Sequence, residues 1–312
     1  MTSPASVVAR RIGISLLLAC VVLPRSSVAG TLYVADRDTN TVAAYNGTTG
    51  ALVNASFITG LDSPWGLARD SAGNFYVANK AAGTVGKYGP DGSVINASFI
   101  EGLNDAAGVA VDGSGRLFVA SDTVQTYDAA TGALINDSFV TGLNSPRGMA
   151  FDGAGNLYVA SALGDTIGKY NATTGAAINA SLITGLSYPV NMAFDATGKL
   201  YVSSLSGLGV EVFNPTTGAI ISSPLVVGLR DLWGIAFDES NNFFVSRYLD
   251  GAVAKFTASG TVVANPLATR NALGPTSLVY VGSVPEPSTL ALAASASLIG
   301  AIGLVRRRSR KR

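Results

Sequence analysis

The stretch GLARDSAGNFYVA at residues 66–78 holds two short apolar segments joined by a polar turn that contains Asp70 and Gly73. Short strands separated by Asp and Gly are typical of a β-hairpin. The pattern returns four more times with the spacing between its two segments unchanged. The copies are GVAVDGSGRLFVA (108–120), GMAFDGAGNLYVA (148–160), NMAFDATGKLYVS (191–203) and GIAFDESNNFFVS (234–246). The chain is therefore built on an internal repeat.

A sixth copy of the second segment, LYVA at 32–35, opens the repeated region. The aromatic residue of this segment recurs after 43, 42, 40, 43 and 43 residues, at positions 33, 76, 118, 158, 201 and 244. A third strand follows, as in TVGKY at 84–88, and then a fourth, as in SVIN at 93–96. Four short strands at a period near 42 residues are typical of a propeller blade, so six copies predict an all-β, six-bladed β-propeller.

The two ends of the repeated region complement each other. The region begins on a second strand, at 32–35, and ends on a first strand, at 275–281. We expect the N-terminal three strands and the C-terminal strand to complete one blade, which closes the ring and covers its open edges. The repeat resembles the NHL repeat and, more loosely, that of the gluconolactonase-like propellers, over residues 30–283.

Residues 1–29 have the features of a secretory signal peptide: Arg10 and Arg11, an apolar run at 12–23, and small residues before Gly30. The apolar run is about half of the roughly 20 residues that a membrane span needs. The only cysteine, Cys20, lies within it; lipidation at Cys20 is an alternative to cleavage after Ala29.

The C-terminus, 284–312, has three parts. Val284-Pro285-Glu286-Pro287 precedes an apolar run at 290–305, long enough for a short transmembrane helix, and then six basic residues close the chain. This tail resembles the PEP-CTERM sorting signal, also known as the ice-binding protein C-terminal region. The resemblance implies a precursor held transiently in the inner membrane of a Gram-negative bacterium, processing by an exosortase at the motif, and a final place at the cell surface or in the extracellular matrix.

Composition removes several classes of function. The chain has no histidine, which excludes Ser-His-Asp catalysis and His-ligated zinc. Between the two terminal segments, 12 Lys and Arg face 19 Asp and Glu, so the body carries a net charge of −7. Because contacts to phosphates need clustered cations, nucleic acid is not an expected partner.

One position per repeat indicates a binding site. The loops that enter the first strands share one face around a propeller's channel, where ligands usually bind. The residue before the leading Gly of each first strand, or its equivalent, is Trp65, Ala107, Arg147, Val190, Trp233 or Thr276. Nearby loop residues are Tyr188, Arg230 and Asp231. Aromatic rings beside Arg and Asp suit sugar recognition or contact with a partner protein, whereas the alternative is that both Trp rings are structural plugs.

Evidence for a metal or for catalysis is weaker. Residues 36–40 (DRDTN) alternate oxygen ligands as a calcium loop does but lack its later Glu, so we interpret them as a solvated turn and expect no cofactor, with calcium as an alternative. The enzymatic propellers that the repeat resembles hold a divalent metal with Glu, Asn and Asp. Here none of the three Glu of the body lies on a first strand, and no ligand set or base–nucleophile pair forms around Asn191.

These observations favour a binding or scaffold module over an enzyme. The expected partner is an exopolysaccharide or another matrix protein. Two alternatives stay open: a metal-dependent lactonase or related hydrolase that uses Asp and Asn facing the channel, and a purely structural protein whose repeats pack in the matrix. The sequons at Asn54, Asn96, Asn136 and Asn179 recur at one repeat position, and we interpret them as strand-edge structure rather than glycosylation sites.

Overall fold

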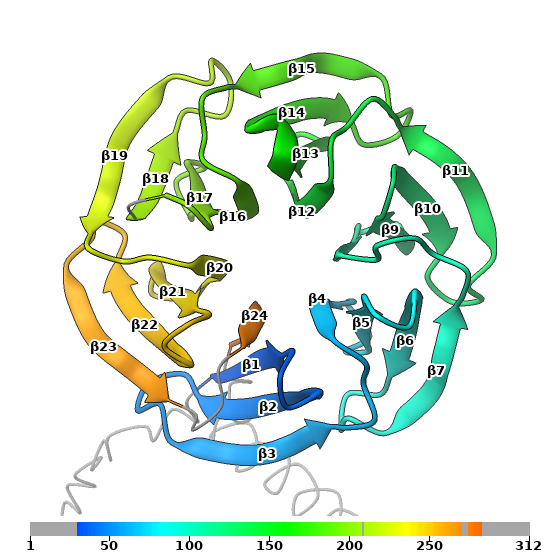
Figure 1. Cartoon of the computed structure of the whole chain (residues 1–312), viewed down its shortest axis with the longest axis horizontal. Helices are drawn as coiled ribbons and strands as arrows, with labels where there is room; N and C mark the ends of the chain where they lie inside the picture. The colour runs from blue at the N-terminus through cyan, green and yellow to red at the C-terminus, as the bar shows by residue number, and fades with distance from the viewer. Residues whose placement is uncertain (1–29, 208, 270–273, 283–312) are drawn as a thin grey trace, which may run out of the picture. The chain divides into compact units, whose positions relative to one another are not determined.

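The computed structural model describes residues 30–207, 209–269 and 274–282, which form six four-stranded antiparallel sheets arranged around a central channel (Figure 1). The expected six-bladed propeller is confirmed. Blade 1 comprises β24 (Pro275–Val281), β1 (Thr31–Asp36), β2 (Thr41–Asn46) and β3 (Leu52–Ile58). Blade 2 comprises β4 (Pro64–Arg69), β5 (Phe75–Asn79), β6 (Thr84–Tyr88) and β7 (Val94–Ile100). Blade 3 comprises β8 (Gly108–Val111), β9 (Arg116–Ala120), β10 (Val124–Asp128) and β11 (Leu134–Val140).

The second half of the ring repeats this order. Blade 4 comprises β12 (Pro146–Phe151), β13 (Asn156–Ser161), β14 (Thr166–Asn171) and β15 (Ala177–Ile183). Blade 5 comprises β16 (Pro189–Phe194), β17 (Leu200–Ser204), β18 (Gly209–Phe213) and β19 (Ile220–Val227). Blade 6 comprises β20 (Leu232–Phe237), β21 (Asn242–Arg247), β22 (Ala252–Thr257) and β23 (Val262–Thr269). A single 3₁₀ turn, Ala162–Gly164, is the one helical element of the described residues.

Blade 1 closes the ring as expected. The C-terminal β24 pairs antiparallel with β1, in a register that runs from Thr31 opposite Val281 to Asp36 opposite Pro275. The two ends of the propeller are thus held together by a strand ladder, and the inner strands of all six blades contact their neighbours around the channel.

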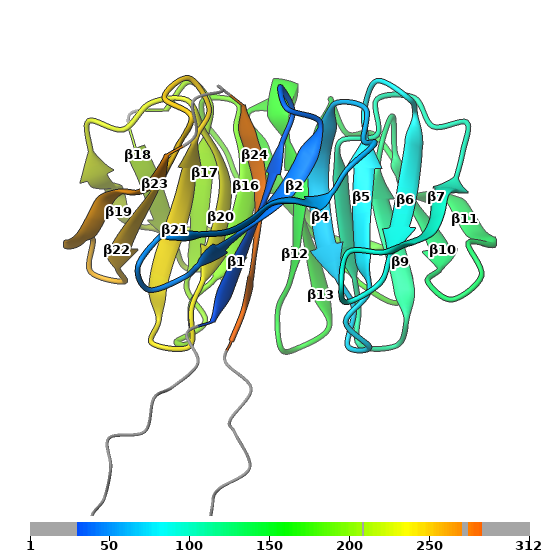
Figure 2. The same ribbon diagram turned by 90° about the horizontal axis from the view of Figure 1, so that it is seen from below.

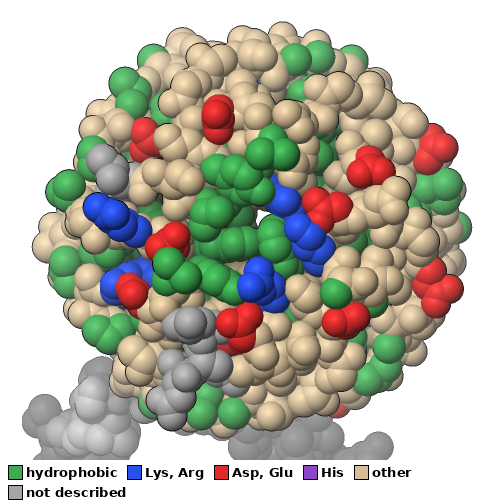
Figure 3. All heavy atoms as spheres, in the orientation of Figure 1, with side chains coloured by type: hydrophobic (Ala, Val, Ile, Leu, Met, Phe, Trp, Pro, Cys, Tyr) green, Lys and Arg blue, Asp and Glu red, His purple; other side chains and the backbone are tan. Residues whose placement is uncertain are grey.

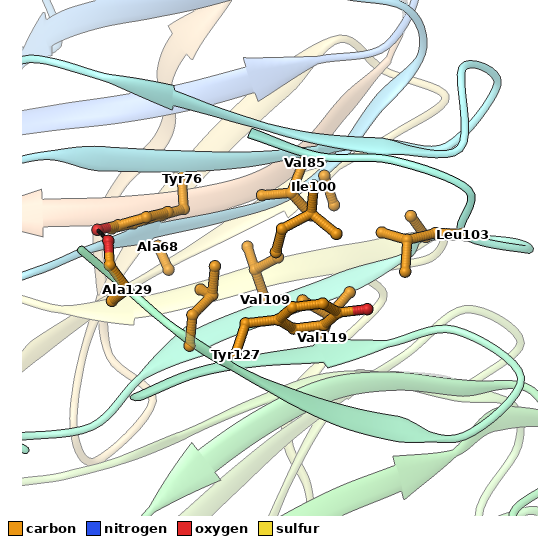
Figure 4. Packing of buried hydrophobic residues seen from close by; sticks show 12 residues of the cluster. Ala68, Tyr76, Val85, Ile100, Leu103, Val109, Val119, Tyr127 and Ala129 are labelled. Atoms are coloured by element: carbon orange, nitrogen blue, oxygen red, sulfur yellow. Dashed lines mark hydrogen bonds between the residues drawn. The ribbon is translucent and has the colours of Figure 1, made fainter. Parts of the chain in front are cut away.

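The hydrophobic core lies between the blades. Each blade is covered on both faces by its neighbours. Strand β5 is therefore buried at every position, and its sequence does not alternate between apolar and polar residues. Figure 4 shows one of these layers, in which Tyr76 and Val85 of blade 2 belong to the same cluster as Val109 and Val119 of blade 3. The Tyr76 hydroxyl donates a hydrogen bond of 2.6 Å to the carbonyl oxygen of Ala129. Apolar burial and this hydrogen bond therefore hold blades 2 and 3 together.

Glycines in the inner strands let neighbouring blades approach closely. A Cβ atom on Gly108 of β8 would lie 2.0 Å from the carbonyl oxygen of Arg147 in β12. Equivalent glycines Gly66, Gly148 and Gly234 face the next inner strand with Cβ distances of 2.9, 2.6 and 2.9 Å. The narrow inner ring therefore requires the missing side chain at these positions.

The turns between the first and second strands have a repeated structure. Each begins with an aspartate whose Oδ1 accepts the backbone N–H four residues later, at 2.8–2.9 Å. These turn aspartates are Asp70, Asp112, Asp152, Asp195 and Asp238. In blade 6 the buried Lys255 pairs with Asp238 at 2.8 Å and donates to the carbonyl of Gly47 at 2.9 Å, which links blade 6 to blade 1.

The outer strands are interrupted by the sequon residues. In each of β3, β7, β11 and β15, Oδ1 of the sequon asparagine accepts the backbone N–H two residues later, at 2.9–3.1 Å. The pairing of these strands shifts register at that point. The sequons therefore form Asx turns that bend the outer edge of the sheet, which limits pairing with another chain.

The two faces of the propeller differ in what they carry. Figure 2 shows that β1 begins and β24 ends on one face, together with the turns between first and second strands. The inner strands begin on the opposite face, which we call the mouth face. The described chain therefore ends, at Gly282, on the face opposite the mouth face.

Several sequence expectations lie outside the described residues: the signal peptide at 1–29, the motif Val284–Pro287 and the apolar run at 290–305. Within the described ranges, no helix has the length and hydropathy required to cross a membrane.

Candidate functional site

A cavity of about 160 Å³ occupies the channel at the mouth face. Six of its lining residues occupy the position singled out in the repeat, and we call them the mouth ring: Trp65, Ala107, Arg147, Val190, Trp233 and Thr276. Large side chains alternate with smaller ones around this ring. The small Thr276 lies between the two tryptophans, and the small Ala107 lies between Trp65 and Arg147, so the large groups can meet across the channel.

Trp65 is at the centre of these contacts. Its ring meets the Trp233 ring edge to face, with centroids 4.6 Å apart and an angle of 82° between the planes. The guanidinium carbon of Arg147 lies 4.5 Å from the Trp65 ring centroid, and Nζ of Lys80 lies 3.7 Å from it. Edge-to-face aromatic pairs and cations over an indole are both attractive arrangements, so this group fixes the geometry of the mouth.

One carboxylate is shared by the two cations. Asp105 lies 2.6 Å from Nζ of Lys80 through Oδ1 and 3.5 Å from Nη1 of Arg147 through Oδ2. The Nη2 group of Arg147 donates a hydrogen bond of 3.2 Å to the Tyr188 hydroxyl. Two positive charges and one negative charge therefore meet beside the Trp65 ring.

Four N–H-bearing atoms of the mouth ring are buried without a hydrogen-bond acceptor. They are Nε1 of Trp65, Nε1 of Trp233, and Nε and Nη1 of Arg147. The Arg147 side chain is 6% exposed, and its contact with Asp105 is an ion pair but not a hydrogen bond for Nη1. Buried donors are nearly always satisfied in folded proteins, and each unsatisfied one costs about 1–3 kcal/mol. Four of the six unsatisfied buried side-chain atoms in the described part of the chain thus belong to three residues of the mouth ring.

A second aromatic group extends the mouth on the blade 6 side. The rings of Trp233 and Tyr248 lie 5.4 Å apart, and the guanidinium of Arg37 sits 4.7 Å from the Tyr248 ring centroid. Arg37 also contacts the Tyr248 hydroxyl, which donates to Asp38 at 3.3 Å. Burial raises the pKa of Tyr248, with the nearby Arg37 charge opposing that rise, so the phenol stays protonated at neutral pH.

The sequence-predicted residues divide into two groups. Trp65, Trp233 and Arg147 line the cavity, and Tyr188 reaches it through Arg147. Arg230 is exposed on the loop before β20, and Asp231 has a left-handed backbone (φ 54°) whose carbonyl accepts the Tyr248 N–H at 2.9 Å. Among the described residues that line the cavity, neither of these two is found.

Sequence reasoning missed Lys80, Tyr248 and Asp105. Lys80 and Tyr248 directly follow the second strands β5 and β21, which end on the mouth face. Comparing the residue after each second strand would have drawn attention to both. Asp105, in the loop before β8, occupies the repeat position of Ser63, Ser145, Tyr188 and Asp231, all with positive φ, so comparing the copies would have drawn attention to it as well.

No metal centre is formed in the described part of the chain: no three Asp, Glu, His or Cys side chains are grouped there as metal ligands. In the DRDTN stretch, Asp36 Oδ1 accepts the backbone N–H groups of Asp38 and Thr39 at 3.1 and 2.9 Å, and Arg37 pairs with Asp38 at 3.3 Å. These carboxylates are therefore engaged within a turn.

Comparison with known proteins identifies the tail and the fold. Residues 283–310 match the PEP-CTERM protein-sorting motif, which implies export, membrane-anchored sorting and processing by an exosortase. No curated protein matches the chain. The chain is thus a propeller joined to a sorting tail.

Solved structures share the architecture at low identity. A chain of the nidogen–laminin complex superposes with a TM-score of 0.69 at 17% identity, over 81% of this chain and 98% of that one. A protein of unknown function from Bacteroides caccae gives 0.64 at 14%, over 81% and 99%. A gluconolactonase from Xanthomonas campestris gives 0.55 at 15%, over 71% and 84%. These similarities establish the propeller fold.

Proposed function

We propose that this protein is an exported surface propeller that binds a carbohydrate of the extracellular matrix at its channel mouth. The observation that carries the proposal is the pair Trp65–Trp233 beside Arg147: all three residues line the cavity, and their N–H groups are buried and unsatisfied. A ligand that supplies acceptors there would remove the cost of those free donors, which is a driving force for binding that a merely structural plug lacks.

Sugars fit the chemistry of this mouth. The apolar C–H face of a sugar ring packs on an aromatic side chain, while its oxygens accept hydrogen bonds from N–H groups at the ring edge. The mouth offers both: the half-buried Trp65 and Tyr248 rings, and the donors of Arg147 and the two indoles. Ligand pockets of this type are concave, largely apolar and supplied with few polar groups.

The direction of the mouth agrees with use at a surface. The described propeller ends at Gly282 on the face opposite the mouth, and the sorting motif follows in sequence at 283–310. Attachment at Gly282 would not itself cover the mouth, which a matrix polymer could then reach. The exopolysaccharide of the producing bacterium is therefore the proposed partner.

Tryptophan fluorescence tests the proposal on the full-length protein. The chain has two tryptophans, both in the mouth ring, so any change in emission reports on this site. We expect a saturable change with the exopolysaccharide and a loss of affinity of roughly ten- to hundredfold in Trp65→Ala, with Trp233 as the remaining reporter.

The matched control is Leu163→Ala, which removes a side chain 59% exposed on the mouth face and outside the cavity lining. This variant should bind like the wild type. A fluorescence response that is equal in Trp65→Ala and wild type, or no response to the polymer, would contradict the proposal. Binding of another matrix protein instead would assign the same mouth to a protein partner.

A further inference from the structure

We infer that the channel cavity recognises a carboxylate, so that the ligand class is an acidic sugar, a uronic acid unit of a polysaccharide. The sugar part of this inference rests on the proposed function, whereas the carboxylate part rests on the cavity alone. Its basis is the identity of the free polar atoms, the local charge and the state of the other polar groups in the lining.

The free polar atoms are all donors. An indole Nε1–H donates and cannot accept, and a guanidinium has N–H donors and no acceptor. The four unsatisfied atoms of Trp65, Trp233 and Arg147 can therefore form hydrogen bonds only with acceptors. A neutral sugar hydroxyl can accept, but it also brings an O–H donor that needs its own acceptor. A carboxylate brings two acceptor oxygens and no donor.

Only three of the described residues that line the cavity carry a side-chain oxygen, and each of these oxygens already makes a hydrogen bond. The Thr276 hydroxyl donates to the carbonyl of Pro64 at 2.8 Å, and Asn191 Oδ1 accepts the Met192 N–H at 2.8 Å. The Ser277 hydroxyl accepts the Leu67 N–H at 3.3 Å. The cavity thus offers an incoming O–H group few side-chain acceptors, which disfavours a ligand made only of hydroxyls.

The local charge points the same way. Lys80 and Arg147 are balanced by Asp105 alone, and no residue that lines the cavity within the described chain is Asp or Glu. The group of Lys80, Arg147 and Asp105 therefore carries one surplus positive charge, in a body whose net charge is −7. Figure 3 shows Lys and Arg side chains beside the central opening, with hydrophobic side chains lining it.

The single surplus charge also selects among anions. A carboxylate carries one negative charge, which matches it, whereas a phosphate monoester carries about 1.5 to 2 at neutral pH. Trp65 is half-buried, so the part of its ring that the two cations and Trp233 leave open gives the sugar ring of a uronic acid a surface to pack on. The mouth therefore fits an anionic sugar better than either a neutral sugar or a free phosphate.

The test compares two ligands that differ only by methylation of the carboxylates, which removes their charge: an oligogalacturonate and its methyl ester. Each is titrated into the full-length protein while tryptophan emission is followed. We expect the free acid to bind roughly ten- to hundredfold more tightly than the ester, the range for a hydrogen bond to a charged group. Arg147→Gln should abolish this preference. Lys199→Gln, which removes a cation from an exposed turn on the opposite face, should keep it.

Acetate, a carboxylate without a sugar, separates the two parts of the inference. If acid and ester bind equally well, the carboxylate is not recognised and the inference fails while the proposed sugar-binding function stands. If acetate binds as well as the oligogalacturonate, the carboxylate site stands and the sugar-binding function fails. If none of the three changes the emission, both fail.

Thermal unfolding of Arg147→Gln, measured in parallel, guards against a variant that has lost its fold. If this variant is unfolded, Lys80→Gln takes its place, because Lys80 is partly exposed and supplies the other cation over Trp65. A preference for the free acid that survives in the folded variant would overturn the assignment to this site.

Discussion

Replacing Gly108 by alanine tests how the inner ring is closed. The added Cβ would lie 2.0 Å from the carbonyl oxygen of Arg147, 2.9 Å from its carbonyl carbon and 3.2 Å from the Cβ of Ala120. Ordinary contact begins near 3.4 Å, so β8 and β12 would have to separate by more than 1 Å or the strand would have to twist. Because Gly108 does not adopt a positive φ, the expected cost is steric and arises between the blades.

Overpacking of this kind costs typically about 1–3 kcal/mol. At about 2 kcal/mol, the melting temperature of a domain of this size should fall by roughly 4–8 °C. The assay is thermal and urea unfolding of the full-length protein, each followed by circular dichroism. Gly113→Ala is the matched control, since Gly113 also lacks a positive φ and its Cβ would meet nothing within 4 Å.

We expect the control to unfold at the wild-type midpoint or slightly above it, by up to about 1 kcal/mol through reduced freedom of the unfolded chain. If the two variants unfold at the same midpoint, the inner strands tolerate a side chain, and the argument that glycine sets the ring diameter is refuted. Gly108→Ala should also weaken ligand binding, because the displaced carbonyl belongs to Arg147.

Three further outcomes are expected. Lys255→Met should destabilise the fold by about 3 kcal/mol in urea, because it leaves the Asp238 carboxylate buried without its ion pair, whereas Lys199→Met should have no measurable effect. Burial opposes the charged form of four turn aspartates, but hydrogen bonds outweigh it and lower their pKa: Asp70, Asp112, Asp152 and Asp238. As the pH falls, the unfolded state then binds protons before the folded state does. The free energy of unfolding should therefore be constant from pH 7 to about 5 and drop between pH 4 and 2. An unchanged free energy of unfolding at pH 3 would contradict this. Asn96→Val should straighten β7 and promote self-association in gel filtration, while Asn96→Asp, which keeps the acceptor for Ser98, should stay at the wild-type elution volume.

The architecture could be predicted from the sequence because the repeat contains its own boundaries. The Asp–Gly turn fixes where the first strand ends and the second begins, and the aromatic residue of the second strand packs between blades in every copy, as Tyr76 does. Closure followed from counting strands at the two ends. What the repeat did not reveal is the role of the third-strand lysine, since only the structure shows that Lys87 and Lys255 each donate to a backbone carbonyl of the next blade.

The site was only partly predictable, for a physical reason. The mouth-ring position could be identified from the repeat, so Trp65, Arg147 and Trp233 were found by alignment of the copies. Contact between Trp65 and Trp233 depends on the small size of Thr276 between them, which a list of residue types does not show. The free N–H groups depend on the absence of acceptors within reach, and this becomes visible only in three dimensions.

In the repeat, the residue that sets the spacing of the blades directly follows the residue that lines the mouth. In blades 2, 3, 4 and 6 a glycine lies on the inner strand where the backbone of the next blade approaches most closely. The residue directly before it belongs to the mouth ring and ranges in size from Ala107 to Trp65. Because the glycine sets the spacing of the backbone, the preceding side chain can change without moving the blades. Substituting Ala107 by a polar residue should therefore alter what the mouth binds while leaving the unfolding midpoint close to that of the wild type.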